Sequence, residues 1–230
     1  MRCDAIVDII RRGGPGTYGI TGSAGAGKSH TANRLGRELR CSIYSADYAF
    51  IGTSEDRKLL LSQKQMRSVE GYKDAANQFN WWDWGAILSD LEDLQARTPV
   101  KVSGPYDRST GNYGADLDIP ATDTLLFEGA IFGPPFLLTR LKKIFFLCVD
   151  PAVRFQRLAK KDRDRRAFNE IVARFLVTEY SETLYYRLMF EWAERKIIFI
   201  DGLTGLPCGK PVFPSDLFIP LHVTVPSRES

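Results

Sequence analysis

The feature that most constrains this chain is a glycine-rich stretch near its amino terminus, GITGSAGAGKSH, at residues 19–30. The stretch fits the pattern G-x-x-x-x-G-K-[ST], with Gly22, Gly27, Lys28 and Ser29 at the fixed positions. A short apolar run precedes it and a helical pattern, SHTANRLGRELR, overlaps its end and continues beyond it, which predicts a strand, a loop and a helix. Such a loop turns successive backbone N–H groups toward a phosphate chain, and the helix N-terminus adds its positive dipole end.

The sequence therefore predicts a nucleotide-binding loop. Its lysine would reach the β- and γ-phosphates, and its serine would bind Mg²⁺. We expect ATP as the nucleotide, because the sequence lacks an N/T-K-x-D motif for reading guanine. The residues predicted to contact ATP are Gly22, Ser23, Ala24, Gly25, Ala26, Gly27, Lys28, Ser29 and His30.

Composition narrows the class of protein only slightly. A chain of 230 residues that is 44% hydrophobic can bury one good core, so we expect one compact domain. The net charge of +3 is too small to require a nucleic acid partner. Four scattered cysteines without C-x-x-C spacing indicate reduced thiols, and two distant histidines, His30 and His222, give no support to a histidine metal site. With no long apolar run, we expect a cytoplasmic protein that does not enter the membrane.

Short apolar strands alternate with helical patterns along most of the chain. This alternation predicts an α/β fold of the P-loop NTPase type, in which helices cover both faces of a mostly parallel sheet. Ligands then gather at the carboxyl ends of the strands, where Asp47, Glu128 and Asp150 follow three of the predicted strands. The predicted strands are TYGIT, CSIYSAD, VKVSG, TLLFEG, KIFFLCVD and IIFIDG, and the predicted helices cover residues 28–40, 57–69, 84–95, 135–141 and 152–196.

We expect a single domain over residues 1–202, with a small basic segment at about residues 157–167. The tail at residues 203–230 is richer in Pro and Gly, and we expect it to pack on the domain.

Together these landmarks resemble those of the uridine kinase and phosphoribulokinase family of P-loop kinases, which also includes nicotinamide riboside and pantothenate kinases. The resemblance covers roughly residues 17–201. It rests on GSAGAGKS, on SADYAF after the second strand, on an aromatic and acidic segment before ILSDLEDL, and on GPYD, LLFEG and a basic segment before a long helix. It implies transfer of the γ-phosphoryl group of ATP, with Mg²⁺, to a hydroxyl of a small molecule.

Two carboxylates match family positions in the reaction centre. Asp47 of SADYAF lies where the family places an acid that orients the acceptor hydroxyl and takes its proton. The alternative role for Asp47 is a helix N-cap. Glu128 of LLFEG matches the family acid that binds Mg²⁺ alongside Ser29, and its alternative role is a solvated acid at a strand end.

The segment RLAKKDRDRR, residues 157–166, matches the lid whose arginines close over the phosphates. Arg163 and Arg166 fit the lid positions best, so we assign them a catalytic role beside Lys28 and Asp47. The register is open, however, and Lys160, Lys161 and Arg165 are alternatives. As a plain charge run, the segment would be a solvated helix face.

The acceptor site is predicted from two further segments. In NQFNWWDWGAILSDL, Asp83 matches a hydroxyl-binding acid and Trp82 is a candidate for stacking on a base, as are Trp81 and Trp84. One or two of these tryptophans could instead anchor the following helix in the core.

In GPYDRSTG, Tyr106 and Asp107 match residues beside the base in uridine kinases. Those enzymes carry a histidine a few residues later, where this chain has Ser109, Thr110 and Gly111. This departure argues against plain uridine or cytidine as the acceptor.

Three functions fit the sequence. The first is a kinase for a nucleoside-like small molecule. The second is a phage-type kinase that acts on 5-hydroxymethyluracil bases in DNA, where the tryptophans would hold an extruded base. The third is an ATP-dependent switch that phosphorylates no acceptor.

Overall fold

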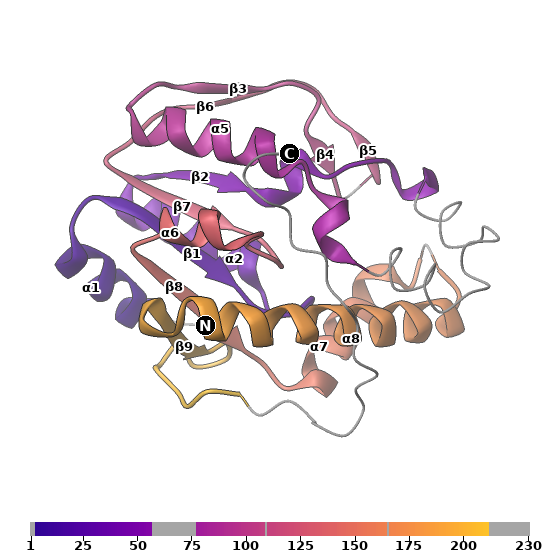
Figure 1. Cartoon of the computed structure of the whole chain (residues 1–230). Coiled ribbons are helices and arrows are strands. Elements are labelled where there is room, and N and C mark those ends of the chain that lie inside the picture. The colour runs from indigo at the N-terminus through magenta and orange to yellow at the C-terminus, as the bar shows by residue number, and fades with distance from the viewer. Residues whose placement is uncertain (1–2, 57–76, 109, 165, 212–230) are drawn as a thin grey trace.

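The computed structural model describes residues 3–56, 77–108, 110–164 and 166–211. Its centre is a parallel sheet with the strand order β2-β7-β1-β8-β9 (Figure 1). The strands are bounded by Ser42–Ser45 (β2), Thr124–Glu128 (β7), Gly16–Thr21 (β1), Lys143–Cys148 (β8) and Ile197–Asp201 (β9). The predicted α/β class with a mostly parallel sheet is confirmed.

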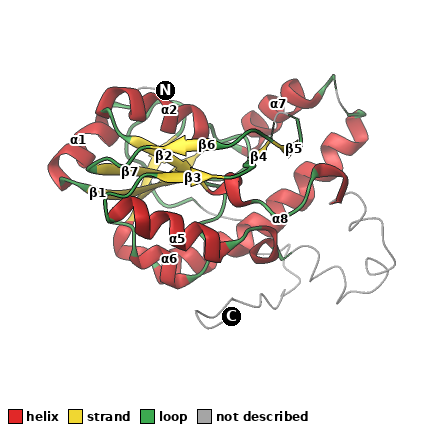
Figure 2. Ribbon diagram, turned by 90° about the horizontal axis from the view of Figure 1, so that it is seen from above, coloured by secondary structure: helices red, strands yellow, loops and turns green. Residues whose placement is uncertain are grey.

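One face of the sheet is covered by two helices, α1 (Asp4–Gly13) and α2 (Lys28–Leu39) (Figure 2). Alternate side chains of the central strands, such as Tyr18, Ile20 and Leu126, are buried in the apolar cluster that includes these helices. Helix α1 is absent from the predicted elements, although its buried residues recur at helical spacing: Ile6, Val7 and Ile10.

The other face is covered by α5 (Trp84–Gln95), α6 (Pro135–Thr139) and α8 (Phe168–Trp192) (Figure 2). Here the intervening strand side chains, among them Phe127 and Phe146, enter a second and larger cluster rich in aromatic rings. Because strand side chains alternate between the two faces, the central strands are apolar throughout.

Two short antiparallel pairs lie outside the main sheet. They join β3 (Val100–Val102) to β6 (Leu117–Ile119), and β4 (Tyr106–Asp107) to β5 (Asn112–Tyr113). The expectation that VKVSG belongs to the parallel sheet is therefore wrong. The strand in this segment is only three residues long and its central Lys101 is exposed, which suits a pair covered on one face rather than a doubly buried strand.

The β4–β5 hairpin packs on the segment that follows β2. The amide of Gly52 donates to the Tyr113 hydroxyl at 2.8 Å, and the amide of Ser54 donates to the Gly111 carbonyl at 2.9 Å. The hairpin is thereby held beside the 3-10 helix η1 (Ala46–Ala49), at the carboxyl end of β2.

After β8 the chain forms α7 (Pro151–Asp162), then α8, then the short η4 (Glu194–Lys196) before β9. Asp150 caps α7, because its side chain accepts from the Ala152 amide at 2.8 Å. A further 3-10 helix, η3 (Gln78–Trp81), leads into α5. No helix within the described ranges combines the length and the apolar character needed to cross a membrane.

Two predicted segments fall wholly or partly outside these ranges. The helix expected at residues 57–69 lies outside the described residues, as does the tail from residue 212 onward. The beginning of the tail turns back along β9, where Pro207 bridges to Ile200 and the Cys208 amide donates to the Phe199 carbonyl at 2.9 Å. Packing of the whole tail on the domain stays a prediction.

Candidate active site

The phosphate loop occupies residues 22–27, between the end of β1 and the start of α2. Gly22 has φ +142°, and a Cβ there would lie 2.6 Å from the Leu147 carbonyl oxygen, so the position requires glycine. Gly27, at φ 95°, is the N-cap of α2 and provides no side-chain cap. The first turn of α2 therefore points its backbone amides into the loop, which is the arrangement that binds anions.

Lys28 is buried at the start of α2. Its Nζ donates to the carbonyl oxygens of Gly22 at 2.8 Å and Ser23 at 3.3 Å, so the ammonium is bound to the loop backbone. His30, which follows Ser29 in the first turn, is exposed.

Ser29, in the first turn of α2, and Glu128, the last residue of β7, face each other. The Ser29 hydroxyl donates to both carboxylate oxygens of Glu128, each at 3.3 Å, and the Ser45 hydroxyl donates to Oε1 at 2.6 Å. Glu128 is 5% exposed, which excludes the alternative of a solvated acid at the strand end.

This donor set suits a hard divalent cation. Hydroxyl and carboxylate oxygens are the ligands that Mg²⁺ prefers, usually with waters and substrate phosphates completing its octahedron. Among the described residues no group of three or more His, Cys, Asp or Glu could hold a metal ion. A site that takes one carboxylate and one hydroxyl from the protein and the remainder from nucleotide and water fits both observations.

Asp47 lies in η1 and not at a helix cap. The N-cap of η1 is Ser45, and η1 has no side-chain cap. The Asp47 carboxylate instead binds Arg108, with Nη2 donating to Oδ1 at 2.6 Å and Nε paired with Oδ2 at 2.5 Å. Arg108 directly follows β4, so the hairpin brings this arginine to the end of β2.

The charges of these groups influence one another. Burial raises the pKa of Glu128, and the nearby Asp47 carboxylate raises it further. Burial also lowers the pKa of Lys28; Glu182 opposes that shift and Arg108 adds to it. Loss of water around Arg108 lowers its pKa, but the nearby Asp47 and Glu128 carboxylates outweigh this effect, so the pKa of Arg108 is raised. Lys28, Arg108, Asp47 and Glu128 thus form one charged centre at the carboxyl ends of β1, β2 and β7.

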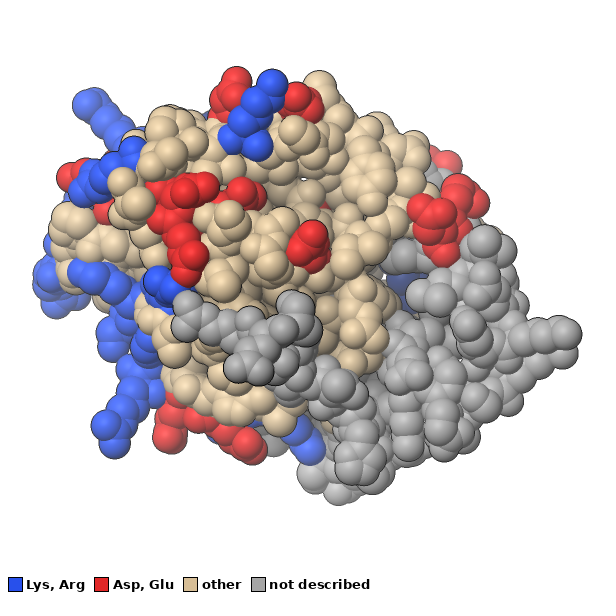
Figure 3. All heavy atoms as spheres, turned by 45° about the horizontal axis from the view of Figure 1, so that its top comes forward, with Lys and Arg blue, Asp and Glu red and all other residues tan. Residues whose placement is uncertain are grey.

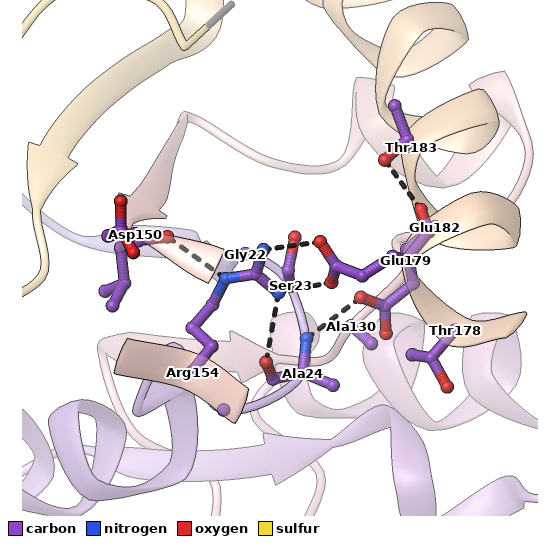
Figure 4. A network of polar contacts seen from close by, with 12 residues as sticks. Gly22, Ser23, Ala24, Ala130, Asp150, Arg154, Thr178, Glu179, Glu182 and Thr183 are labelled. Atoms are coloured by element: carbon purple, nitrogen blue, oxygen red, sulfur yellow. Dashed lines mark hydrogen bonds and ion pairs between the residues drawn. The ribbon is translucent and has the colours of Figure 1, made fainter. Parts of the chain in front are cut away.

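The far side of the loop is held by α7 and α8 (Figure 4). The buried Arg154 of α7 donates from Nε to the Val149 carbonyl at 3.0 Å and from Nη1 to the Ala24 carbonyl at 3.3 Å, and it forms a two-bond ion pair with Glu179 of α8. One turn further along α8, Glu182 accepts from the Ala24 amide at 2.9 Å. Arg157 donates to the Gly25 carbonyl at 3.1 Å.

The predicted lid arginines pair with acids of their own segment. Arg163 is 70% exposed and pairs with Asp164, whereas Arg166 pairs with Asp162. Lys160 and Lys161 are exposed near the end of α7, and Arg165 lies outside the described residues. Both named arginines have acidic partners here, and their role over the phosphates stays a prediction.

The aromatic residues of the predicted acceptor site form one cluster with Phe50. Trp82 is 3% exposed, and its ring lies against Trp81 (centroids 6.3 Å apart), Trp84 (5.7 Å) and Phe50 (5.0 Å). Tyr106 is also buried and stacks on Phe50 at 5.1 Å. Trp84 anchors α5 in the core, while Trp81 is the half-buried ring of the three tryptophans.

The two acids predicted to bind the acceptor lie at the start of α5 and in the β4–β5 hairpin. Asp83 is exposed and caps α5, accepting from the Ala86 amide at 2.9 Å, and we find no contact between its side chain and Asp47 or Glu128 in the described structure. Asp107 pairs with Asn112 across the hairpin, and its carbonyl accepts from the Gly111 amide at 2.8 Å. Their predicted roles as acceptor ligands remain untested.

Four charged residues at this site were not predicted: Arg108, Arg154, Glu179 and Glu182. The sequence contained a signal for two of them, because Glu179 and Glu182 are three residues apart on one face of a helix that also carries buried aromatic residues. Arg108 and Arg154 carried no local signal, since each reaches its partner only through tertiary packing.

Comparison with known proteins finds likeness in three-dimensional structure. No family model and no curated protein matches the sequence. The fold is similar to that of a protein designated a fructose transport system kinase from Silicibacter sp. TM1040, with a TM-score of 0.60 and 16% identity, covering 83% of this chain and 95% of that one. It is also similar to D-glycerate 3-kinase from Cryptococcus neoformans (TM-score 0.52, 12% identity, 87% and 90% covered). A third similar structure is the YGR205w protein (TM-score 0.55, 16% identity, 86% and 91% covered). The resemblance read from the sequence is thus confirmed at the level of fold: this chain has the α/β fold of the P-loop kinases.

Proposed function

We propose that this chain is an ATP-dependent and Mg²⁺-dependent kinase that transfers the γ-phosphoryl group of ATP to a hydroxyl of a small molecule, with a nucleoside-like acceptor as the first expectation. One observation carries the proposal. The carboxyl ends of three adjacent strands bring together a phosphate loop, a buried carboxylate opposite its serine, and a second carboxylate at the edge of the same centre.

The loop residues would bind the triphosphate. Backbone amides of residues 22–29 would face the phosphate oxygens, and Lys28 would move from the Gly22 and Ser23 carbonyls toward the β- and γ-phosphates. Ser29 and Glu128 would hold Mg²⁺, which supplies charge neutralisation for the phosphate oxygens.

Asp47 would address the acceptor. Its carboxylate would orient the hydroxyl in line with the γ-phosphorus and accept the hydroxyl proton. The acceptor oxygen forms a bond to the γ-phosphorus, the bond from the γ-phosphorus to the bridging oxygen breaks, and that electron pair leaves with ADP. Asp47 then returns the proton to water.

The face that Figure 3 presents gives DNA no particular support as an acceptor. On this face Lys and Arg side chains gather mainly along one edge, and acidic side chains lie both among them and elsewhere, so the described part of this face carries no continuous basic surface. DNA binding depends strongly on such a surface. A base in DNA is therefore retained only as one arm of the test.

The test is transfer of labelled γ-phosphate from ATP to a panel of acceptors. The panel contains ribonucleosides, deoxynucleosides, nicotinamide riboside, pantothenate, and hydroxymethyluracil both free and in DNA. Fructose and D-glycerate are added because two proteins of similar fold carry those names. Label on a free small molecule is the expected result, and label on DNA alone would replace the proposed acceptor class. ATP binding without transfer to any acceptor would favour an ATP-dependent switch that phosphorylates no acceptor.

A further inference from the structure

The contact between Arg108 and Asp47 places a guanidinium next to the acid that would address the acceptor. Both carboxylate oxygens of Asp47 are bound, one by Nη2 at 2.6 Å and the other by Nε at 2.5 Å. A guanidinium has five N–H donors, and Nη1 takes no part in this pair. The Asp47 side chain is 14% exposed, whereas that of Arg108 is 45% exposed, so part of the arginine side chain is accessible while its partner is largely enclosed.

Arg108 also lies within electrostatic reach of the phosphate loop. Burial lowers the pKa of Lys28, and among the neighbouring charges Arg108 lowers it further. The two cations repel each other, and a polyanion bound between them would stabilise both, since opposite charges at short range favour the ionised forms. Arg108, beside Asp47, and Lys28, at the start of α2, are therefore two cations of one charged centre.

The other arginines near the site have different positions. Arg154 and Arg157 donate to carbonyl oxygens on the far side of the loop, while Arg163 and Arg166 pair with acids of the lid. Arg108 is the guanidinium that the described structure holds against the acceptor-side acid.

We propose that Arg108 is a catalytic residue of the proposed kinase reaction: Asp47 orients it so that its remaining N–H groups bind the phosphoryl group in transit between ATP and the acceptor oxygen. The proposal rests on the proposed function. Guanidinium groups match phosphate oxygens in geometry, and charge that develops on the equatorial oxygens of the moving phosphoryl is what a kinase must neutralise.

This role differs from a purely supporting one. If Arg108 only positioned Asp47, replacing Arg108 would lower activity only by displacing the Asp47 carboxylate. If it binds the phosphoryl group, its loss also weakens the complex with ADP, Mg²⁺ and fluoroaluminate, which imitates the phosphoryl group in flight, while ADP binding is preserved.

The first experiment compares Arg108→Gln and Arg108→Lys with a matched control, using the acceptor identified in the panel. Arg140→Gln is the control because Arg140 is a partly exposed arginine paired with a glutamate, Glu92, near the amino end of β8 and away from the loop. Arg108→Gln is expected to lower kcat by about 10²-fold or more with little change in the KM for ATP. Arg108→Lys should retain part of the activity, and Arg140→Gln should match the wild type. A further variant, Arg108→Ala, should be partly rescued by guanidinium added to the assay.

The second experiment measures fluoroaluminate complex formation with ADP and Mg²⁺ in the wild type, Asp47→Asn, and the double variant Asp47→Asn/Arg108→Gln. The proposal predicts that the double variant binds the complex more weakly than Asp47→Asn alone. Equal affinity in these two variants would assign Arg108 a supporting role and overturn the proposal. If the wild type turns over and Arg108→Gln is as active as Arg140→Gln, the role of Arg108 is overturned as well, while the kinase function stands. A wild-type protein that neither transfers phosphate nor forms the fluoroaluminate complex would overturn both.

Discussion

Glu182 of α8 accepts a hydrogen bond from the amide of Ala24 in the predicted phosphate loop, at 2.9 Å, so a protein carboxylate occupies one backbone amide of that loop. Glu182 is 3% exposed, and burial is the main cause that raises its pKa to about 7, against the opposing effects of Lys28 and the Ala24 amide. The titratable and charged groups that face it are Lys28 from α2, Arg154 from α7, Glu179 and Tyr186 from α8, and Arg108 from the β4–β5 hairpin.

The first prediction concerns ATP affinity and pH. Above about pH 7 Glu182 is ionised and repels the triphosphate, so ATP affinity should fall as pH rises, by up to about tenfold per pH unit. Glu182→Gln should bind ATP more tightly at about pH 8 and should lose this component of the pH dependence. Calorimetry on both proteins checks this, because titration of the nucleotide itself is common to the two. Glu191→Gln, at an exposed position on α8, is the control. Identical pH profiles for wild type and Glu182→Gln would refute the prediction.

The second prediction concerns the free energy of unfolding. Because the pKa of Glu182 is raised from 4.5 to about 7 in the folded state, its contribution is most favourable below pH 4.5 and is lost as pH rises through about 7. The full shift corresponds to about 3 kcal/mol. Glu182→Gln should therefore be more stable than wild type at about pH 8, with the difference shrinking toward about pH 5. Urea denaturation at both pH values measures it, and a difference that grows on acidification would contradict the sign.

The third prediction concerns the metal site. Glu128→Gln removes the carboxylate opposite Ser29 and should lower phosphoryl transfer by about 10²-fold while raising the Mg²⁺ concentration needed for half-maximal rate. Ser45→Ala removes only the hydrogen bond that orients Glu128, so its effect should be smaller and in the same direction. Mg²⁺ titrations of the initial rate check both variants. An unchanged Mg²⁺ requirement in Glu128→Gln would remove Glu128 from the metal site.

The fourth prediction concerns the shape of the loop. Gly22→Ala would place a Cβ 2.6 Å from the Leu147 carbonyl oxygen at a φ that L residues rarely adopt, so it should destabilise the fold by about 2–4 kcal/mol and impair ATP binding. Gly209→Ala is the matched control, because nothing lies within 4 Å of a Cβ there. Thermal unfolding of both variants tests this, and equal stabilities would show that the loop accommodates the methyl group.

Local pattern was enough to predict the strand–loop–helix arrangement around residues 19–30 and the strand that ends at Glu128. The loop from Gly22 to Ser29 encodes its own backbone shape, and Glu128 follows a strand whose uninterrupted apolar character marks it as central. Asp47 could also be placed at a strand end, although its pairing with Arg108 could not. The alternation of strands and helices was sufficient to predict the parallel sheet.

The surroundings of Asp47 were harder to predict because packing between distant segments builds them. The β4–β5 hairpin brings Arg108 across 61 positions of sequence to Asp47, and no local spacing encodes that approach. The sequence could not decide whether the tryptophans stack on a base or pack in the core, and the structure places Trp82 and Trp84 in the core. A three-residue apolar run such as β3 fits a buried parallel strand or a half-covered antiparallel pair equally well, and its pairing with β6 decided the outcome.

The measurement that tests the account most directly compares ATP binding and phosphoryl transfer in the wild type and in Asp47→Asn, with Asp83→Asn, a substitution at an exposed capping acid, as a second variant. The account predicts that Asp47→Asn keeps ATP affinity within a few-fold of wild type while transfer to the acceptor collapses. Transfer by Asp47→Asn within a few-fold of the wild-type rate would contradict the assignment of Asp47 as the group that takes the acceptor proton.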